Sequence, residues 1–417
     1  MSGSDELEVT LRTIGSLEEV DCAAWNALAG VSRSGDASGT PYNPFVSHAF
    51  LSALEESGSV GRRTGWMPQH VVVETADGDV LGAAPTYLKV HSQGEYVFDH
   101  GWADAFERAG GDYYPKLLTA VPFTPATGPR LLVREGSQAA GVRGALVQGL
   151  AALAEGNGLS SAHVNFANET DAAALEEAGW LPRLDRQFHW RNRDYESYDD
   201  FLAGLASRKR KSLKRERREA LSNGIVIEWL SGEAITEAAW DAFYAFYMDT
   251  GSRKWGRPYL TRGFFSLVGE TMGDDVVLIM ARREGRWIAG ALNFVGGDTI
   301  YGRHWGCVEH HPFLHFEVCY HQAIDYAIAH GLGSVEAGAQ GEHKLARGYT
   351  PVLTRSFHHI VNPSFRRAVA DYLKHEREEV MLYADALDGY APFRRGERTD
   401  RGEGRFAIRH REVEEQE

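Results

Sequence analysis

A polar stretch near the end of the chain, residues 340–347, brings together side chains that could move a proton and hold a charged substrate. It reads Gln-Gly-Glu-His-Lys-Leu-Ala-Arg and follows a strand predicted over residues 334–339. Ligands of open α/β sheets bind beyond the ends of strands, so this position suits a site. The candidate catalytic residues are Glu342, His343 and Lys344, with Gln340 to orient a carbonyl, and Lys344 and Arg347 to hold a phosphate or carboxylate.

These side chains alone specify no reaction, but they suit transfer of an activated acyl group to an amine, which a family resemblance described below implies. A thioester or aminoacyl ester needs chiefly an amine held in line with its carbonyl, and positioning can supply about 7–11 kcal/mol of the barrier. A general base, here Glu342 or His343, adds about 3–5 kcal/mol. The alternative is a short solvated helix with Glu342 near its positive N-terminus, and the residues alone leave both interpretations open.

A second polar group lies at the end of a strand predicted from residue 299. Arg303, His304 and Trp305 could bind a ring or a phosphate, or they could be a packed tryptophan with solvated neighbours. Histidines are frequent in this part of the chain, which raises the question of a metal. Pro312 favours the first position of a helix and leaves His311 outside it, so the chain lacks a ligand pair with zinc-like spacing and we expect no metal site.

The helix predicted over residues 313–329 has two faces. Its apolar residues repeat at helical spacing and are expected to pack inward, whereas Glu317, His321 and Asp325 are expected on a solvated face. Glu317 lies near the start of this helix and is a second candidate for the base. The residues expected to pack inward are Phe316, Cys319, Tyr320, Ala323, Ile324 and Ala327.

A basic helix is predicted over residues 207–220, in a chain whose formal net charge is −14. Such a segregated face could bind the phosphates of tRNA, or it could pair with acidic surface elsewhere on the chain. Its positively charged face consists of Arg208, Lys211, Arg215 and Arg218. The stretch 251–259 adds Arg, Lys and aromatic side chains that could stack on a base or clamp a carboxylate, or simply pack as a loop.

Composition and missing motifs exclude several classes of protein. With 43% hydrophobic and 24% charged residues, the 417-residue chain is expected to be globular and long enough for two domains. An apolar run of about 20 residues and a signal peptide are both missing, and three scattered cysteines suit a reducing compartment, so the cytoplasm is expected. Serine hydrolases with a nucleophile elbow, Walker-type ATPases, HExxH metalloenzymes and CxxC proteins are disfavoured because their motifs are absent.

An internal repeat organises the chain. Each copy is predicted to contain a hairpin with a glycine turn, a third strand, a helix and two further segments led by glycine. In the first copy these lie at 70–84, 95–98, 142–154, 158–164 and 179–182. In the second copy they lie at 277–292, 299–302, 313–329, 331–337 and 348–351.

The repeat predicts the domain organisation. From Gly78 to Gly158 the first copy is about 34 residues longer than the second copy is from Gly285 to Gly331. The aromatic segment 100–133 accounts for these residues as an inserted loop. Such a loop is either functional or merely elaborated surface. We expect a lead-in at 1–43, a first domain at 44–193, a second domain at 194–392 that includes the basic helix, and a charged tail at 393–417 that is too poor in apolar residues to order itself.

The order of elements resembles the GNAT acyltransferase fold in tandem, an α/β fold with mixed central sheets flanked by helices. Specific phrases resemble the FemAB-like family of predicted N-acyltransferases, of the peptidoglycan biosynthesis and recognition type, over roughly residues 44–391. These phrases are HSQGEYVFD at 91–99, YYPKL at 113–117, GRHW at 302–305, HFEVC at 315–319, GAQGEHK at 338–344 and RGY at 347–349.

The resemblance implies transfer of an acyl or aminoacyl group to an amine, with a peptidoglycan precursor or another peptide or small amine as acceptor. It implies aminoacyl-tRNA or acyl-CoA as donor and no tightly bound cofactor. Many acyl-CoA-dependent GNAT enzymes carry a basic Gly-rich loop after the fourth strand, whereas this chain has residues 302–312 there, a departure that weighs against acyl-CoA. The residues that we expect to grip the acceptor in the first domain are Tyr96, Asp99, Trp102, Tyr114 and Lys116.

Two rival functions remain at this stage. One is an acyl-CoA-dependent acetyltransferase that does not use the basic helix. The other is a non-catalytic protein that binds a peptide or cell-wall fragment with a degenerate acyltransferase fold. The acceptor, the donor and the oligomeric state are not specified by the residues.

Overall fold

The structure, a computed structural model, describes residues 8–30, 42–254, 258–338, 341–388 and 392–394. The predicted charged tail therefore lies outside the described residues except for its first two positions. The helices of the first half are α1 (Cys22–Leu28), α2 (His48–Glu56), α3 (His100–Arg108), α4 (Ala139–Gly156) and α5 (Glu169–Glu177). Its strands are β1 (Val9–Ile14), β2 (Trp66–Pro68), β3 (His70–Thr75), β4 (Val80–Ala84), β5 (Thr86–Lys89), β6 (Lys116–Thr119), β7 (Leu132–Val133), β8 (Ser161–Val164) and β9 (Leu181–Arg191).

The second half repeats the alternation of strands and helices. Its strands are β10 (Val226–Leu230), β11 (Val276–Arg283), β12 (Arg286–Gly296), β13 (Thr299–Cys307), β14 (Ser334–Glu336) and β15 (Thr350–Ile360). Its helices are α6 (Tyr198–Ala203), α7 (Ser207–Ala220), α8 (Glu237–Lys254), α9 (Arg262–Met272), α10 (Leu314–Phe316), the π-helical turn η6 (Glu317–His321), α11 (Gln322–Ala329), the 3-10 helix η7 (Glu342–Arg347) and α12 (Pro363–Asp388).

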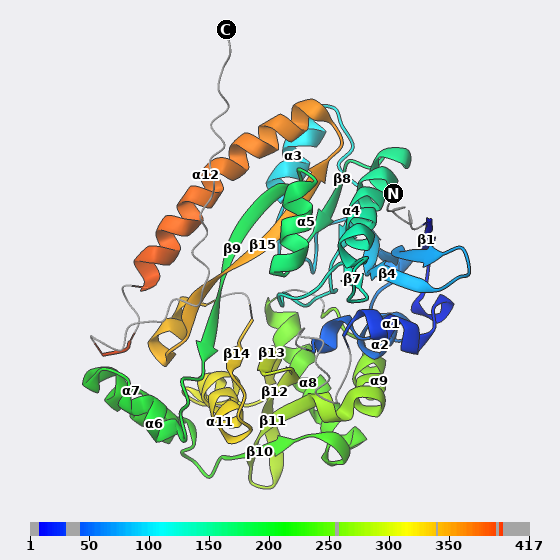
Figure 1. Cartoon of the computed structure of the whole chain (residues 1–417). Helices are drawn as coiled ribbons and strands as arrows, with labels where there is room; N and C mark the ends of the chain where they lie inside the picture. The colour runs from blue at the N-terminus through cyan, green and yellow to red at the C-terminus, as the bar shows by residue number, and fades with distance from the viewer. Residues whose placement is uncertain (1–7, 31–41, 255–257, 339–340, 389–391, 395–417) are drawn as a thin grey trace.

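Two sheets hold these elements together. A four-stranded sheet has the order β1-β3-β4-β7, and an eleven-stranded sheet has the order β10-β11-β12-β13-β14-β9-β15-β8-β6-β5-β2. The long sheet runs through the whole molecule, with the second half below, the first half above, and α12 lying along β9 and β15 (Figure 1). One sheet therefore joins both halves.

The two predicted hairpins are confirmed. Gly78 has φ of 89° in the first turn, and Glu284 and Gly285 have φ of 51° and 77° in the second, the left-handed conformation that tight hairpins require. In the second half, β11, β12 and β13 form the expected meander. In the first half the meander is divided, because β3 and β4 belong to the small sheet whereas β2 and β5 belong to the large one.

The strand predicted over residues 95–98 is wrong. Tyr96 has φ of 59°, which a strand does not accommodate, and Glu95 is buried in a polar cluster. The third strand of the first meander is β6, which pairs with β5. Because β6 lies within residues 100–133, that segment is not simply an inserted loop: the added residues lie on both sides of β6, and α3 and β7 are among them.

The second part of each repeat is confirmed, and it is exchanged between the halves. Gly158 and Gly331 precede β8 and β14 with φ of 65° and 66°, and Gly179 and Gly348 precede β9 and β15 with φ of 77° and 87°. However, β9 pairs with β14 of the second half, and β15 pairs with β8 of the first half. Each half thus gives its last strand to the other, and the two exchanged strands pair with each other.

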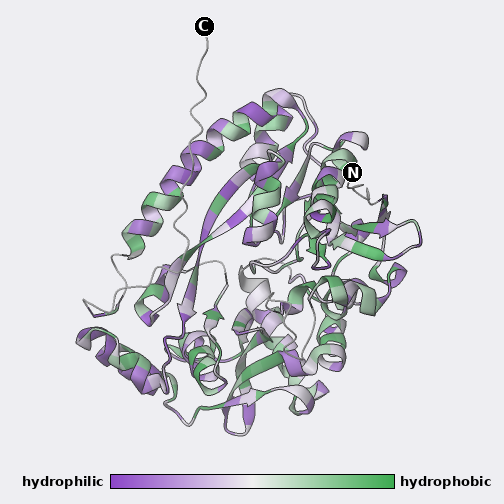
Figure 2. Ribbon diagram, viewed as in Figure 1, coloured by the Kyte–Doolittle hydropathy of each residue, from purple (hydrophilic) through white to green (hydrophobic). Residues whose placement is uncertain are grey.

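The core is shared in the same way. Phe45 and Phe50, from the segment around α2, contact Phe294 of β12 with ring centroids 5.2 and 5.4 Å apart, and Phe50 also contacts Phe264 of α9. Part of the predicted lead-in belongs to the fold of the first half, because β1 pairs with β3 and Trp25 of α1 is fully buried. Apolar colour gathers on strands β11 and β12, whereas α7 is mostly hydrophilic (Figure 2).

Candidate functional site

Strands β13 and β14 diverge at the middle of the large sheet. They are parallel and pair only over Thr299–Tyr301 and Ser334–Glu336, after which β13 continues to Cys307 whereas β14 ends. Residues of η7 follow shortly after β14. The opening between the two strands is therefore bordered by the end of β14, the second part of β13 and η7, which is where the sequence predicts the site.

The first half has the same divergence, but its own chain closes it. Strands β6 and β8 are parallel and pair over three residues. The backbone N–H of Gly128 donates to the carbonyl of Phe166 at 3.1 Å, and Asn168 donates back to Gly128 at 3.1 Å. The buried Arg130 donates to the carbonyls of Asn165 at 2.9 Å and Ala126 at 2.5 Å. The divergence in the second half is the better candidate for a substrate site.

Lys344 lies at this opening and is 1% exposed. Its Nζ donates to the carbonyl of Gly338 at 2.8 Å, a carbonyl that follows the end of β14. Burial and the positive charge of Arg303 lower the pKa of Lys344 to about 7. A lysine with such a pKa can exchange a proton near neutrality, which an exposed lysine cannot.

Arg303 and Glu336 lie on the two diverging strands, and the charge of Arg303 acts on both Glu336 and Lys344. Arg303 donates from Nε to the carbonyl of Gly302 at 2.9 Å, and its Nη1 is buried without a hydrogen-bond partner in the described part of the chain. The Oε2 atom of Glu336 is likewise buried without a hydrogen-bond partner among the described residues, and its Oε1 lies 3.7 Å from Nδ1 of His189. Burial raises the pKa of Glu336 to about 7, against the opposing effect of Arg303 and Arg191.

The other predicted residues of η7 have partners. His343 forms a hydrogen bond from Nε2 to the hydroxyl of Tyr320 at 3.0 Å. Glu342 accepts a hydrogen bond from the hydroxyl of Tyr383 on α12. Arg347 donates to both carboxylate oxygens of Glu216, at 2.8 and 2.7 Å, and lies on the ring of Phe316. Arg347 is therefore a fixed structural link to α7, whereas Gln340 lies outside the described residues.

The solvated face predicted for the helix at 313–329 is wrong. Glu317 and His321 are 0% exposed, because α6 and α7 cover this face. Arg217 of α7 binds Glu317 at 2.8 Å and Asp325 at 2.6 Å, and His321 binds Glu216 at 2.8 Å. A π-helical turn, η6, begins at Glu317 and shifts the register of the side chains on this face. Glu317 is thus committed to an ion pair and is not placed to act as a base.

His304 and Trp305 pack against different neighbours. His304 lies edge-on to Tyr247 with ring centroids 5.0 Å apart, and burial together with Arg303 lowers its pKa to about 3, so it is neutral. Trp305 contacts His315 at 5.2 Å, and His315 in turn contacts Tyr320. These rings form one wall that continues to His343.

The first-half residues expected to hold the acceptor are largely paired with one another. Lys116 is 0% exposed and donates to Glu95 and Ser92, each at 2.8 Å, and it is also paired with Asp99. Trp102 is packed against His358 and Arg183, and the hydroxyl of Tyr114 bonds Ser92. Tyr96 is separate from this cluster: burial raises the pKa of its hydroxyl, against the opposing effect of the positive charge of Arg303.

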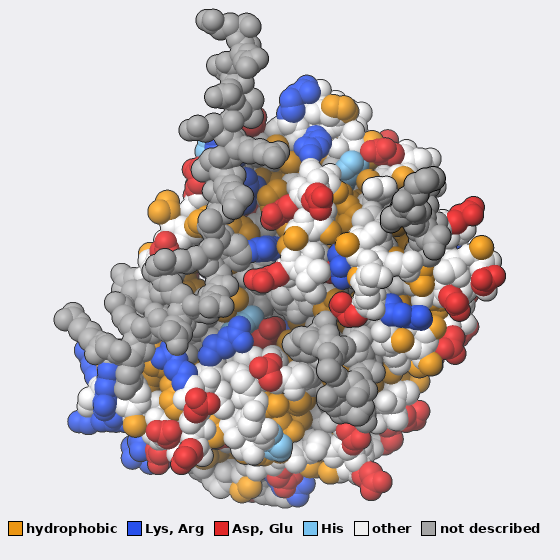
Figure 3. Space-filling view, viewed as in Figure 1, with side chains coloured by type: hydrophobic (Ala, Val, Ile, Leu, Met, Phe, Trp, Pro, Cys, Tyr) orange, Lys and Arg blue, Asp and Glu red, His pale blue; other side chains and the backbone are white. Residues whose placement is uncertain are grey.

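The basic helix forms as predicted, and α7 spans Ser207–Ala220. Arg208, Lys211, Arg215 and Arg218 are exposed, and blue side chains gather over α7 at the lower left of the molecule (Figure 3). Arg215 pairs with Glu219 at 3.6 Å, and the other three form no ion pair with any residue that the structure describes. Arg217 and Glu216, on the opposite face, attach α7 to η6 and η7.

Three residues at or near the opening were not predicted from the sequence: Glu336, His189 and Tyr320. Glu336 could have been recognised from the sequence as a candidate site residue, because it is a carboxylate within a predicted buried strand. His189 could not, because it comes from β9 of the other half and reaches the site only through the strand exchange. Tyr320 was placed on the apolar face, and its hydroxyl bonds His343 there.

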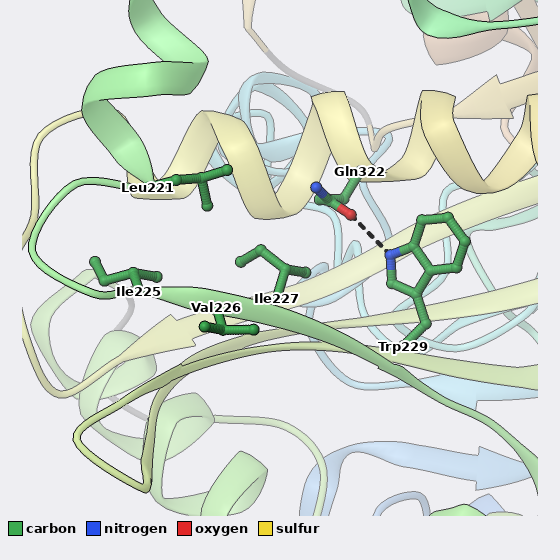
Figure 4. Close-up of a pocket in the computed structure, with 6 residues that line it drawn as sticks. All are labelled: Leu221, Ile225, Val226, Ile227, Trp229 and Gln322. Carbon is green, nitrogen blue, oxygen red and sulfur yellow. Dashed lines mark hydrogen bonds between the residues drawn. The ribbon is translucent and has the colours of Figure 1, made fainter.

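A groove lies elsewhere, between β10, the end of α7 and the helix η6–α11. It has a volume of about 630 Å³, and Trp229 donates to Gln322 at its edge at 2.8 Å (Figure 4). Its lining is otherwise apolar and offers no titratable group, so we do not assign the chemistry to it. The lining residues are Leu221, Ile225, Val226, Ile227, Trp229 and Gln322.

Two findings concern the described residues as a whole, one on membrane-spanning helices and one on metal sites. In the residues that the structure covers, no helix combines the length and the apolar character needed to cross a membrane. Likewise, these residues contain no group of three His, Cys, Asp or Glu side chains arranged to hold a metal ion.

Several solved proteins have an architecture similar to that of this chain. A solved protein of unknown function from Bacteroides thetaiotaomicron has a TM-score of 0.50 and 9% identity, covering 85% of this chain and 100% of that chain. The crystal structure of FemX has a TM-score of 0.49 and 15% identity, covering 84% and 98%. A tandem GNAT protein from the clavulanic acid biosynthesis pathway has a TM-score of 0.41 and 12% identity, covering 85% and 99%. No curated protein sequence matches the chain.

The family comparison covers nearly the whole chain. A family model described as FemAB-like, peptidoglycan biosynthesis/recognition, matches residues 16–395. The predicted α/β fold with two tandem GNAT-like units and mixed, helix-flanked sheets is confirmed, with the two units joined by exchanged strands. The chain therefore belongs to the FemAB-like family of acyltransferases.

Proposed function

We propose that this protein is an N-acyltransferase that moves an acyl or aminoacyl group from an activated donor to an amine, at the opening between β13 and β14. The observation that supports this most directly is Lys344, a buried lysine whose Nζ donates a hydrogen bond to a backbone carbonyl at that opening. The acceptor that fits the family is a peptide of a peptidoglycan precursor, because the family model is described by peptidoglycan biosynthesis and recognition.

The proposed reaction needs little covalent chemistry from the protein. The amine nitrogen attacks the donor carbonyl, a C–N bond forms, and the bond from carbonyl carbon to the donor oxygen or sulfur breaks. The neutral form of Lys344 takes the proton that the amine loses and can return it to the leaving group, while Arg303 stabilises negative charge on the carbonyl oxygen. Lys344 is proposed as the catalytic residue rather than Glu342 or His343, whose side chains bond Tyr383 and Tyr320.

Aminoacyl-tRNA is the donor that we favour over acyl-CoA. The exposed basic face of α7 suits a polyphosphate backbone, and α7 is attached to the site through Glu216 and Arg347. A nucleic-acid strand bound on α7 would thus lie against an element that leads directly to η7. Acetyl-CoA is the second donor to be tested.

The test is incubation of the purified protein with labelled aminoacyl-tRNA or, separately, acetyl-CoA, together with a cell extract, followed by mass spectrometry for a transferred group. Lys344→Met and Lys344→Arg are both expected to lower the rate by about 10²–10⁴-fold, because neither side chain can accept a proton near neutrality. The rate of the wild type is expected to rise with pH through about 7, as Lys344 loses its proton.

Lys374→Met is the matched control, since Lys374 is an exposed lysine on α12. Circular dichroism establishes that each variant is folded. A full rate in Lys344→Arg would contradict proton transfer by Lys344. Absence of any product in the wild type, with binding of a peptidoglycan fragment retained in the Lys344 variants, would favour a binding protein instead.

A further inference from the structure

Two opposite charges at the opening act on each other without forming an ion pair in the described part of the chain. These charges, Arg303 and Glu336, each leave one buried polar atom, Nη1 and Oε2, without a partner among the described residues. Glu336 is in register with Tyr301, and Tyr301 and Arg303 both lie against the ring of Phe45, with Arg303 at a bulge of β13. Their side chains therefore border one part of the opening.

Each charge is held in its place by neighbours. Arg303 is fixed by the carbonyl of Gly302 and lies 5.6 Å from the ring centroid of Phe45, and Glu336 lies next to His189 of β9. Buried groups that lack partners destabilise a fold unless something else satisfies them. A ligand with one positive and one negative or strongly polar group would satisfy both.

We propose that Glu336 and Arg303 form a subsite for an amino-acid unit, in which Glu336 binds an α-ammonium group and Arg303 binds the adjacent carbonyl or carboxylate oxygen. This inference rests on the proposed function, since it names the chemical class of group that the transferase site accepts. Lys344 lies at the same opening, where its Nζ donates to the carbonyl of Gly338.

The places of the two charges fit such a unit. In an amino acid the ammonium and the carboxylate are both attached to the α-carbon, so the groups that bind them must lie close to each other. Glu336 is the last residue of β14, and Arg303 lies two positions beyond Tyr301, the partner of Glu336 on β13, where the two strands part.

Two sources could present this chemistry. An aminoacyl ester carries an α-ammonium next to an ester carbonyl, and the end of an acceptor peptide or a free amino acid carries one next to an amide or a carboxylate. An acetyl group carries no ammonium at all, so the subsite distinguishes an amino-acid unit from a simple acyl group.

The test is binding to the full-length protein, without turnover. Ligand-observed NMR is carried out with the twenty L-amino acid amides, which represent the aminoacyl ester, then with the twenty free L-amino acids, and then with the N-acetylated amides. The ligand that gives the strongest signal is titrated by calorimetry. We expect an amide, a free amino acid or both to bind, and the N-acetylated form of the same ligand to bind at least about tenfold more weakly.

Variants separate the role of charge from that of shape. Glu336→Gln is expected to weaken binding of the amine ligand by about 10- to 100-fold and to leave the acetylated ligand unchanged, and Glu336→Asp is expected to restore part of the affinity. Glu309→Gln is the matched control, because Glu309 pairs with Arg283 and His311 outside the site. Circular dichroism and thermal unfolding confirm that each variant is folded.

Each outcome bears on the inference. Binding of amides alone assigns the subsite to the donor, and binding of free amino acids alone assigns it to the acceptor. Equal binding of acetylated and free amines, equal binding by Glu336→Gln, or no binding of any amide or amino acid to the wild type would overturn it. Amine-dependent binding without any acyl transfer would overturn the proposed function and leave this inference standing, and the reverse result would overturn the inference alone.

Discussion

At the scale of single residues, one physical cause acts on two groups of opposite charge. Burial lowers the pKa of Lys344 and raises that of Glu336, and both arrive at about 7. The pKa values of the buried Lys89 and Glu95 in the first half also reach about 7, so the shifts of Lys344 and Glu336 support a site only together with the place of these residues at the opening. In the first half, Lys116 and Asp99 are buried as completely, but they are in contact, so the pKa of Lys116 is raised and that of Asp99 is lowered.

The pKa of Glu336 predicts how binding of an amine ligand depends on pH. Below about 7 the carboxyl of Glu336 gains a proton and no longer attracts an ammonium group. Above about 8 an ordinary α-amino group loses its charge. Affinity is therefore expected to be highest between about pH 7 and 8, measured by calorimetry across pH 5–9, and Glu336→Gln is expected to lack the acidic limb. The charged or titratable groups facing Glu336 are Arg303, Arg191, Arg130, Asp298, Tyr301 and His189.

A second prediction concerns Glu216, which joins α7 to the site. Hydrogen bonds from His321 and Arg347 outweigh burial and keep the pKa of Glu216 below its ordinary value of 4.5. Glu216→Ala leaves Arg347 buried without its carboxylate and is expected to lower the free energy of unfolding by about 3–5 kcal/mol, measured by urea denaturation at pH 7. The difference from wild type is expected to shrink as the pH falls through the acid range, because Glu216 then becomes protonated in the wild type.

Glu219→Ala on the same helix is the control for this measurement. Among the described residues, Glu219 pairs with the exposed Arg215, and such surface pairs contribute about 0–1 kcal/mol. A loss in Glu216→Ala no larger than that of the control would show that the link to Arg347 does not stabilise the fold.

At the scale of elements, the helix η6–α11 shows why periodicity alone gave the right helix and the wrong face. The sequence places Glu317, His321 and Asp325 on one side, and a surface helix would expose them. The structure covers that side with α7, whose Arg217 supplies the opposite charge. The pairing of Glu317 with Arg217 joins residues 100 positions apart, so no local pattern could reveal it.

The exposed face of α7 carries a prediction of its own. Reversing Arg208, Lys211, Arg215 and Arg218 to glutamate is expected to abolish retention of tRNA at low salt. If each residue contacts one phosphate, the reversal also removes about 3 from the slope of log affinity against log salt. Retention is measured by filter binding over a range of salt concentrations. The fold is expected to persist, because Glu216 and Arg217 on the other face remain.

The control is a reversal of four exposed basic residues on other elements, Arg63, Arg108, Arg367 and Lys374. This variant has the same change in net charge, so it separates a specific face from general electrostatic attraction. Equal loss of tRNA by both variants would contradict a binding role for α7.

At the scale of the whole molecule, the duplication could be predicted from the sequence, and the exchange between its copies could not. Turn glycines such as Gly78 and Gly285 and the glycines before β8 and β14 specify the local units, because each needs a positive φ. The partner of β9 is set by packing over long distances in the sequence. His189 reaches Glu336 only through that pairing, so the complete site was not predictable from local signals.

The exchange predicts that the halves depend on each other. Fragments 1–193 and 194–417, expressed separately, are expected to lack cooperative unfolding, because β8 loses β15 and β14 loses β9. Expressed together, they are expected to associate and to elute as one species in size-exclusion chromatography. Fragment 194–349, which lacks β15, is expected not to rescue fragment 1–193. Independent folding of either half would contradict this expectation.

The exchanged strands also bear on how the chain acquires its structure during synthesis. Strand β8 ends at Val164, whereas its partner β15 ends at Ile360. At roughly 5–20 residues per second, a ribosome needs about 10–40 s to make the intervening chain. Throughout that interval the nascent first half exposes an open edge at β8, which makes it a natural client for chaperones that shield unpaired strands until translation is complete.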